Sequence, residues 1–214
     1  MKKTLLTLAA LAAVSAVPAH ADVLLGGKAA VDGWFADGKV NNTEYNDVDT
    51  VVSGYVALEH PIPLIPNARI GFTPVEIGTD GFAASFDQVD YTAYYEILDN
   101  DLVSLDLGVS LQNFQNGKLN GKSFDEWVPA VFGDARVNLP MTGLGVFATV
   151  NAGSYDDNTT RDMRAGIQWS LPMAVADLNL RGGYRKMDYD FDGVTKNGGK
   201  VELDGFFMGA ELDF

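Results

Sequence analysis

The stretch L-V-S-L-D-L-G-V-S-L-Q-N-F, residues Leu102 to Phe114, decides the fold, because its apolar side chains recur at every second position. The odd-numbered residues from Val103 to Leu111 are apolar, and the even-numbered residues between them are polar or glycine. A helix would repeat its apolar residues every three to four positions, whereas a strand with two different faces repeats them every two. The same alternation recurs at Arg161–Leu171 and Gly205–Phe214. The sequence therefore predicts an all-β protein.

Followed along the chain, this alternation predicts ten strands, or eight if one hairpin is misplaced. The expected ranges are 23–35, 50–60, 68–74, 87–98, 102–114, 127–139, 144–154, 161–171, 177–187 and 202–214. Compact connections alternate with longer polar ones, which we expect at 36–49, 115–123, 155–160 and 188–200. Short turns at one end and long loops at the other are typical of bacterial outer-membrane barrels.

Residues 1–21 have the pattern of a secretory signal peptide. Lys2 and Lys3 precede an apolar core from Leu5 to Val17, and Ala19-His20-Ala21 forms a small-x-small cleavage site. We expect export, with residues 22–214 forming the mature barrel in the outer membrane. Removal of the two lysines leaves 13 basic residues against 29 acidic ones.

Composition excludes several classes of function. The 214-residue chain has no cysteine, which rules out disulfides, thiolate metal sites and cysteine nucleophiles. Its net charge of −14 argues against nucleic acid as a partner, since phosphate binding requires a cationic face. His60 is the one histidine after the signal peptide, and His60-Pro61 is typical of a turn. We therefore expect no catalytic residues and no cofactor.

The polar face of the predicted strands decides between a soluble sandwich and a membrane barrel. It combines small residues with charges of both signs at mid-strand, which suits a crowded closed interior, while the apolar face meets lipid. Aromatic residues near the strand ends resemble interfacial girdles. The prediction is a closed antiparallel transmembrane β-barrel with a lumen charge network of Lys28, Asp32, Arg69, Asp90, Glu96, Asp106, Asp134, Arg136, Arg164, Arg181 and Glu211.

Three functions fit such a lumen. Paired charges that fill the interior would make the protein a structural or surface component of the membrane. A narrow small-solute channel, porin-like and mildly cation-preferring, is the alternative, because acidic residues outnumber basic ones on the polar face. An outer-membrane enzyme is the weakest reading, because the sequence places no nucleophile beside a base.

One acidic segment has the spacing of a metal loop. Asp188, Asp190, Asp192 and Gly193 match the first half of a calcium-binding loop, but its twelfth position, which should be glutamate, is Gly199. A solvated acidic loop is the competing interpretation.

Two groups of residues carry a resemblance to known families. The C-terminal pattern Phe206, Met208, Ala210, Leu212 and Phe214 looks like the insertion signal of outer-membrane barrels, which implies recognition by the barrel-assembly machinery. The segments V-L-L-G-G-K-A (23–29), L-E-H-P-I-P-L-I-P-N (58–67), Y-Y-E-I-L-D-N (94–100) and S-Y-D-D (154–157) together resemble a family of outer-membrane barrels named for its Gly-Gly pair. The resemblance spans most of the mature chain and implies fold and location, with outer-membrane lipid and lipopolysaccharide as surroundings, but no activity. We expect a monomer.

Overall fold

The computed structural model describes residues 25–45, 48, 50–62, 64–78, 83–194 and 199–214; the predicted signal peptide lies outside them. The strands are β1 (Gly26–Val40), β2 (Thr43–Tyr45), β3 (Val51–Glu59), β4 (Asn67–Ile77), β5 (Ala84–Asp99), β6 (Val103–Leu119), β7 (Lys122–Asn138), β8 (Leu144–Tyr155), β9 (Asn158–Pro172), β10 (Asp177–Phe191) and β11 (Lys200–Asp213). No helix among the described residues is long and apolar enough to cross a membrane.

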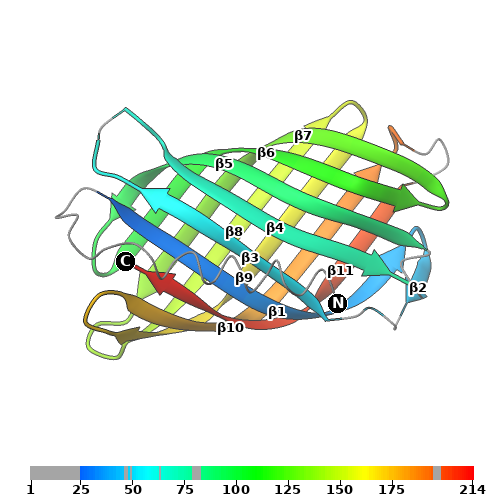
Figure 1. Ribbon diagram of the computed structural model, residues 1–214. Coiled ribbons are helices and arrows are strands. Elements are labelled where there is room, and N and C mark those ends of the chain that lie inside the picture. Colours follow the sequence, from blue (N-terminus) through cyan, green and yellow to red (C-terminus); the bar gives the residue numbers. More distant parts are fainter. Residues whose placement is uncertain (1–24, 46–47, 49, 63, 79–82, 195–198) are drawn as a thin grey trace.

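The strands close into an antiparallel barrel, seen from the side in Figure 1. Each long strand pairs with the next in sequence, and β1 pairs with β11 from Lys28↔Asp213 to Val40↔Val201. β2 pairs only with the last residues of β1, beyond the end of the β1–β3 ladder, so the wall has ten strands. The predicted fold class is thus confirmed with ten strands rather than eight. We call the end that holds Phe214 the inner end and the opposite one the outer end.

The two faces of the wall differ as the alternation requires. Large apolar side chains on the outward face are exposed, with Val109 at 62% and Ile167 at 64%. The alternate residues point into the lumen and are buried, as Asp106 and Ser110 are on β6. Because a water-exposed wall of this composition would be strongly unfavourable, the outward face suits hydrocarbon.

Two connections at the outer end are tight hairpins, and the longer loops predicted at 115–123 and 155–160 are wrong. β6 and β7 are joined by Asn120-Gly121, with φ of 49° and 77°, and β8 and β9 by Asp156-Asp157, with φ of 49° and 62°. Positive φ at both central residues is the type I′ geometry that suits the twist of a hairpin. A register shift between Phe114 and Gly117 breaks the two-residue period, which hid the continuation of the strand.

The outer half of the lumen is filled by an apolar layer that the sequence analysis did not expect. We call it the aromatic layer; its large members are Trp34, Phe86, Phe114, Tyr189, Phe191, Met187 and Leu203. Phe114 packs against Phe191 with ring centroids 5.1 Å apart and against Phe86 at 5.6 Å. Tyr189 donates a hydrogen bond to Gln88 at 2.6 Å, so its buried hydroxyl is satisfied.

The Gly-Gly pair lies where the barrel closes. Gly27 and Phe214 exchange two backbone hydrogen bonds, of 2.6 Å and 2.9 Å, which extend the β1–β11 ladder. A Cβ on Gly27 would lie 2.9 Å from the Phe214 ring, closer than atoms pack. Gly27 therefore lets the ring of Phe214 lie directly on the backbone of β1.

Candidate functional site: the charge network of the lumen

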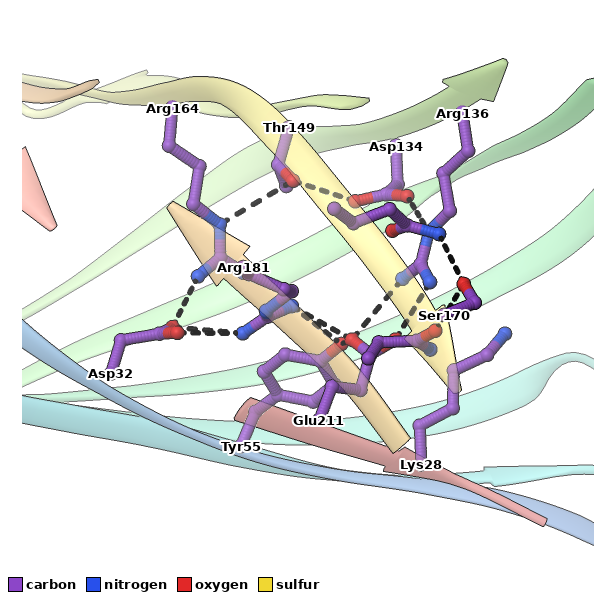
Figure 2. Close-up of polar contacts among 12 residues, drawn as sticks. Lys28, Asp32, Tyr55, Asp134, Arg136, Thr149, Arg164, Ser170, Arg181 and Glu211 are labelled. Carbon is purple, nitrogen blue, oxygen red and sulfur yellow. Dashed lines mark hydrogen bonds and ion pairs between the residues drawn. The ribbon is translucent and has the colours of Figure 1, made fainter. Parts of the chain in front are cut away.

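Arg181 on β10 is the centre of the polar half of the lumen. Its Nη2 donates to both oxygens of Asp32 at 2.9 Å, and its Nη1 donates to Glu211 at 2.7 Å (Figure 2). Gly209 on β11 lies between Asp32 and Arg181 in the ladder. A Cβ on Gly209 would fall 2.1 Å from an Asp32 oxygen, so this glycine leaves the space in which the ion pair forms.

Glu211 is fully buried and accepts hydrogen bonds from residues on three strands, β3, β7 and β10. Arg136, across the lumen on β7, donates to it at 2.7 Å, and Asn179 donates at 3.2 Å. The hydroxyl of Tyr55 on β3 also donates to Glu211. A buried carboxylate is tolerated when cations and donors surround it in this way.

Two further contacts extend the network around the lumen. Arg164 donates to Asp32 at 3.1 Å and to the hydroxyl of Thr149 at 3.4 Å. Thr149 in turn donates to Asp134 at 2.6 Å, and Asp134 accepts from Arg136 at 3.0 Å. These bonds form a continuous chain of hydrogen bonds, in which neighbouring bonds strengthen one another.

Arg185 links this network to the aromatic layer. Its guanidinium donates to Asp162 at 2.7 Å and to the hydroxyls of Ser53 and Thr73, each at 3.1 Å. The same guanidinium lies 4.8 Å from the centroid of the Trp34 ring. Arg185 therefore binds a polar partner on one side and an aromatic face on the other.

The remaining predicted residues lie around this centre in different ways. Near the inner end, Lys28 pairs with Glu59 at 2.6 Å. The Arg69 guanidinium stacks on the Tyr55 ring, 3.6 Å from its centroid.

Three acidic residues of the predicted set have no ion pair within 4.0 Å in the described part of the chain. Asp90 accepts from Gln88 at 2.9 Å, and Asp106 is buried in the wall of the lumen. Glu96 does not join the network, because it is exposed near the inner end of β5, where a register shift follows it.

A polar cavity of about 40 Å³ lies beside the charge network. Its lining includes Tyr55, Arg69, Asp90, Arg164 and Arg185. A cavity of this size holds a few waters at most, since one water needs about 10 to 15 Å³ on the same measure. The cavity is therefore too small to hold a solute larger than a few waters.

The sequence analysis missed the residues that complete the network. Tyr55 and Thr149 carry no charge and so did not stand out. Both occupy the alternate positions of their strands whose side chains point into the lumen. The aromatic layer carries the same signal, because Phe86, Phe114 and Tyr189 all lie on lumen positions. Extending the two-residue alternation beyond the expected strand ends would have identified the aromatic layer.

The predicted calcium site at Asp188, Asp190 and Asp192 stays a prediction, because its loop includes residues 195–198, which lie outside the described part of the chain. β10 continues to Phe191, so Asp188 and Asp190 project from an extended strand and only Asp192 lies in the turn. Among the described residues, which omit 195–198, no three acidic, histidine or cysteine side chains converge on a metal-sized site. A strand separates alternate side chains along one face, whereas a calcium loop must wrap them around a point.

The residues of the predicted C-terminal insertion signal and His60 lie outside the lumen. Phe206 and Met208 are strongly exposed on the outward face of β11, with Ala210, Leu212 and Phe214 following them toward the inner end. His60 is in the β3–β4 turn, where its Nδ1 accepts from the Ile62 backbone at 3.3 Å.

Comparisons with known proteins give likeness in fold only. No family model and no curated protein matches the sequence. Among solved structures, the chain is similar to Neisserial surface protein A (13% identity, TM-score 0.39, covering 89% of this chain and 97% of that one). It is also similar to the beta domain of the Bordetella autotransporter BrkA (12%, 0.46, 90% and 99%) and to outer membrane protease OmpT from Escherichia coli (10%, 0.44, 89% and 93%).

Proposed function

We propose that the protein is an integral outer-membrane barrel that acts as a structural or surface component and conducts no solute. The observation that supports this proposal is that two layers of side chains fill the lumen. The charge network occupies its inner half and the aromatic layer its outer half. Barrels of roughly eight strands have interiors that side chains fill, and a ten-stranded wall with this many large residues is filled in the same way.

Energetics support a permanent filling rather than a gate. Opening a path through the inner half would separate Arg181 from Asp32 and Glu211, and breaking a buried pair costs about 3 to 5 kcal/mol. Opening the outer half would also displace Phe114, which is 0% exposed. The two layers follow one another along the lumen, so a solute would have to displace both.

The export signal and the outward face support the location. An exported chain with a closed wall of exposed Val, Leu, Ile and aromatic residues suits the outer membrane, and its surroundings there would be phospholipid and lipopolysaccharide. Enzymatic activity is not part of the proposal. The imidazole of the one histidine after the predicted signal peptide accepts a hydrogen bond from the Ile62 backbone N–H of its own turn.

Conductance in planar lipid bilayers tests the proposal. Folded protein, identified by its heat-modifiable electrophoretic mobility, should give no steady openings. The variant Phe114→Ala, Phe191→Ala should also stay silent, because the charge network still closes the inner half. Stable wild-type openings whose conductance rises with salt concentration would refute the filled lumen, and cation selectivity of those openings would favour the small-solute channel.

A further inference from the structure

The β3–β4 turn presents an apolar tip at the inner end of the barrel. The segment H-P-I-P-L-I-P, residues 60–66, contains no acidic residue, lysine or arginine. Ile62, Leu64 and Ile65 are 52%, 91% and 51% exposed. In Figure 1 the turn projects from the end of the barrel at which the C-terminus lies. Side chains of this kind are unfavourable in water, and the turn has no charge to offset them.

The backbone of this turn has few N–H donors that need a partner from water. Prolines at positions 61, 63 and 66 have no N–H group. The Ile62 N–H donates to His60 Nδ1 at 3.3 Å, and the His60 N–H donates to the Asn67 side chain at 3.0 Å. In a lipid environment each unsatisfied backbone group costs several kcal/mol, so a turn with few free donors is suited to it.

One hydrogen bond ties the turn to the lipid-facing side of the wall. The hydroxyl of Tyr95, an outward and exposed residue of β5, donates to the Leu64 carbonyl at 2.9 Å. Leu64 has a φ of 71°, a conformation that is uncommon for a bulky residue and strained. The tip is therefore held beside the outward face rather than over the mouth of the lumen.

The neighbouring β5–β6 turn has the opposite chemistry. Asp99 and Asp101 flank Asn100, whose side chain accepts from the N–H groups of Leu102 and Val103. A turn at the inner end of this barrel can thus carry charge. The β7–β8 and β9–β10 turns at the same end are apolar like residues 60–66, with Met141 104% and Val175 76% exposed, so the β5–β6 turn is the charged exception among the four inner-end turns.

We infer that the β3–β4 turn inserts Ile62, Leu64 and Ile65 into the hydrocarbon of the inner leaflet and anchors the barrel to the lipid there. The partner is the acyl region of phospholipid, which the uncharged apolar tip fits. The inference rests on the proposed membrane location. It assigns the turn to the membrane, whereas a turn of ordinary composition would lie in the aqueous periplasm.

Spin labelling tests the inference, because the natural chain has no cysteine to interfere. We would label three single-cysteine variants, Leu64→Cys, Asn100→Cys and Val109→Cys, in vesicles of phosphatidylethanolamine and phosphatidylglycerol. Collision with oxygen reports hydrocarbon, and collision with a water-soluble nickel chelate reports water. The oxygen-to-nickel ratio at residue 64 should match that at the mid-wall residue Val109 and exceed that at Asn100 several-fold. Ile65→Cys provides a second position should Leu64→Cys fold poorly.

The possible outcomes distinguish a failure of the inferred lipid anchor from a failure of the proposed membrane location. A ratio at residue 64 equal to that at Asn100, with Val109 still in hydrocarbon, would overturn the anchor alone. Exclusion of both reagents from residue 64 would also overturn it, since the turn would then be covered by protein. Free access of the nickel chelate to Val109 would refute the membrane location itself.

Discussion

Replacing Glu211 with glutamine tests whether the charge network holds the barrel together. The substitution keeps the size of the side chain but removes its charge and turns one acceptor oxygen into an N–H2 donor. One oxygen of Glu211 faces Arg136 and Asn179, and the other faces Arg181 and Tyr55. In either orientation of the glutamine amide, its N–H2 group therefore faces groups that donate hydrogen bonds to Glu211 in the natural protein.

The expected loss follows from these contacts. Two hydrogen bonds to a charged group are lost, each worth about 1.5 to 3 kcal/mol. Arg136 keeps Asp134 and Arg181 keeps Asp32, so neither cation is left wholly unpaired. We expect the free energy of unfolding to fall by about 3 to 5 kcal/mol, the range for removing one member of a buried pair.

Urea unfolding in lipid vesicles, followed by tryptophan fluorescence, measures this loss. The matched control is Glu202→Gln, on the outward side of the same strand, which should change the free energy of unfolding by less than about 0.5 kcal/mol. A loss for Glu211→Gln within about 1 kcal/mol of the control would show that the network contributes little, contrary to the reasoning above.

Three further substitutions are measured by the same urea titration. Phe114→Ala should lower the free energy of unfolding by about 3 to 5 kcal/mol, the usual value for a large-to-small substitution in a packed core. Phe206→Ala removes a ring that is 70% exposed and should lower it clearly less. Equal losses for the two variants would contradict a packed lumen. Gly209→Ala should cost about 1 to 3 kcal/mol, because its Cβ would meet the Val31 carbonyl at 2.3 Å, and an unchanged midpoint would rule out that close packing. A Cβ on Gly121 would have open space around it, but the φ of this residue is 77°. Gly121→Ala should therefore lower the free energy of unfolding by about 1 to 2 kcal/mol through backbone conformation alone. No change in the free energy of unfolding would mean that the hairpin adopts another conformation without cost.

The alternation of side chains predicted where the strands of the barrel lie but not how far each strand extends. A two-residue period is local, so the middle of β6 is readable from residues 102–114 alone. The shift between Phe114 and Gly117 ends the pattern before the strand ends. Asn120-Gly121 was a readable hairpin signal, and it shows that the strand continues.

The members of the lumen could be predicted, but their partners could not. Parity places Asp32, Arg136, Arg181 and Glu211 inside without any knowledge of the fold. Arg181 and Asp32 are 149 residues apart, and Arg136 and Glu211 are 75 apart. Their meeting depends on the register at the β1–β11 closure and on the tilt of the strands, which a local pattern does not contain.

The position of Arg181 has a consequence for how the chain enters its membrane. This residue on β10 joins Asp32 on the first strand to Glu211 on the last, so its partners arrive together only once both edges of the sheet have met. Before the edges meet, Arg181 already has Glu211 on the neighbouring strand, but Asp32 has neither of its cations, Arg164 and Arg181. A carboxylate without a counter-ion is strongly unfavourable in hydrocarbon, so we expect Asp32 to stay hydrated until the edges join.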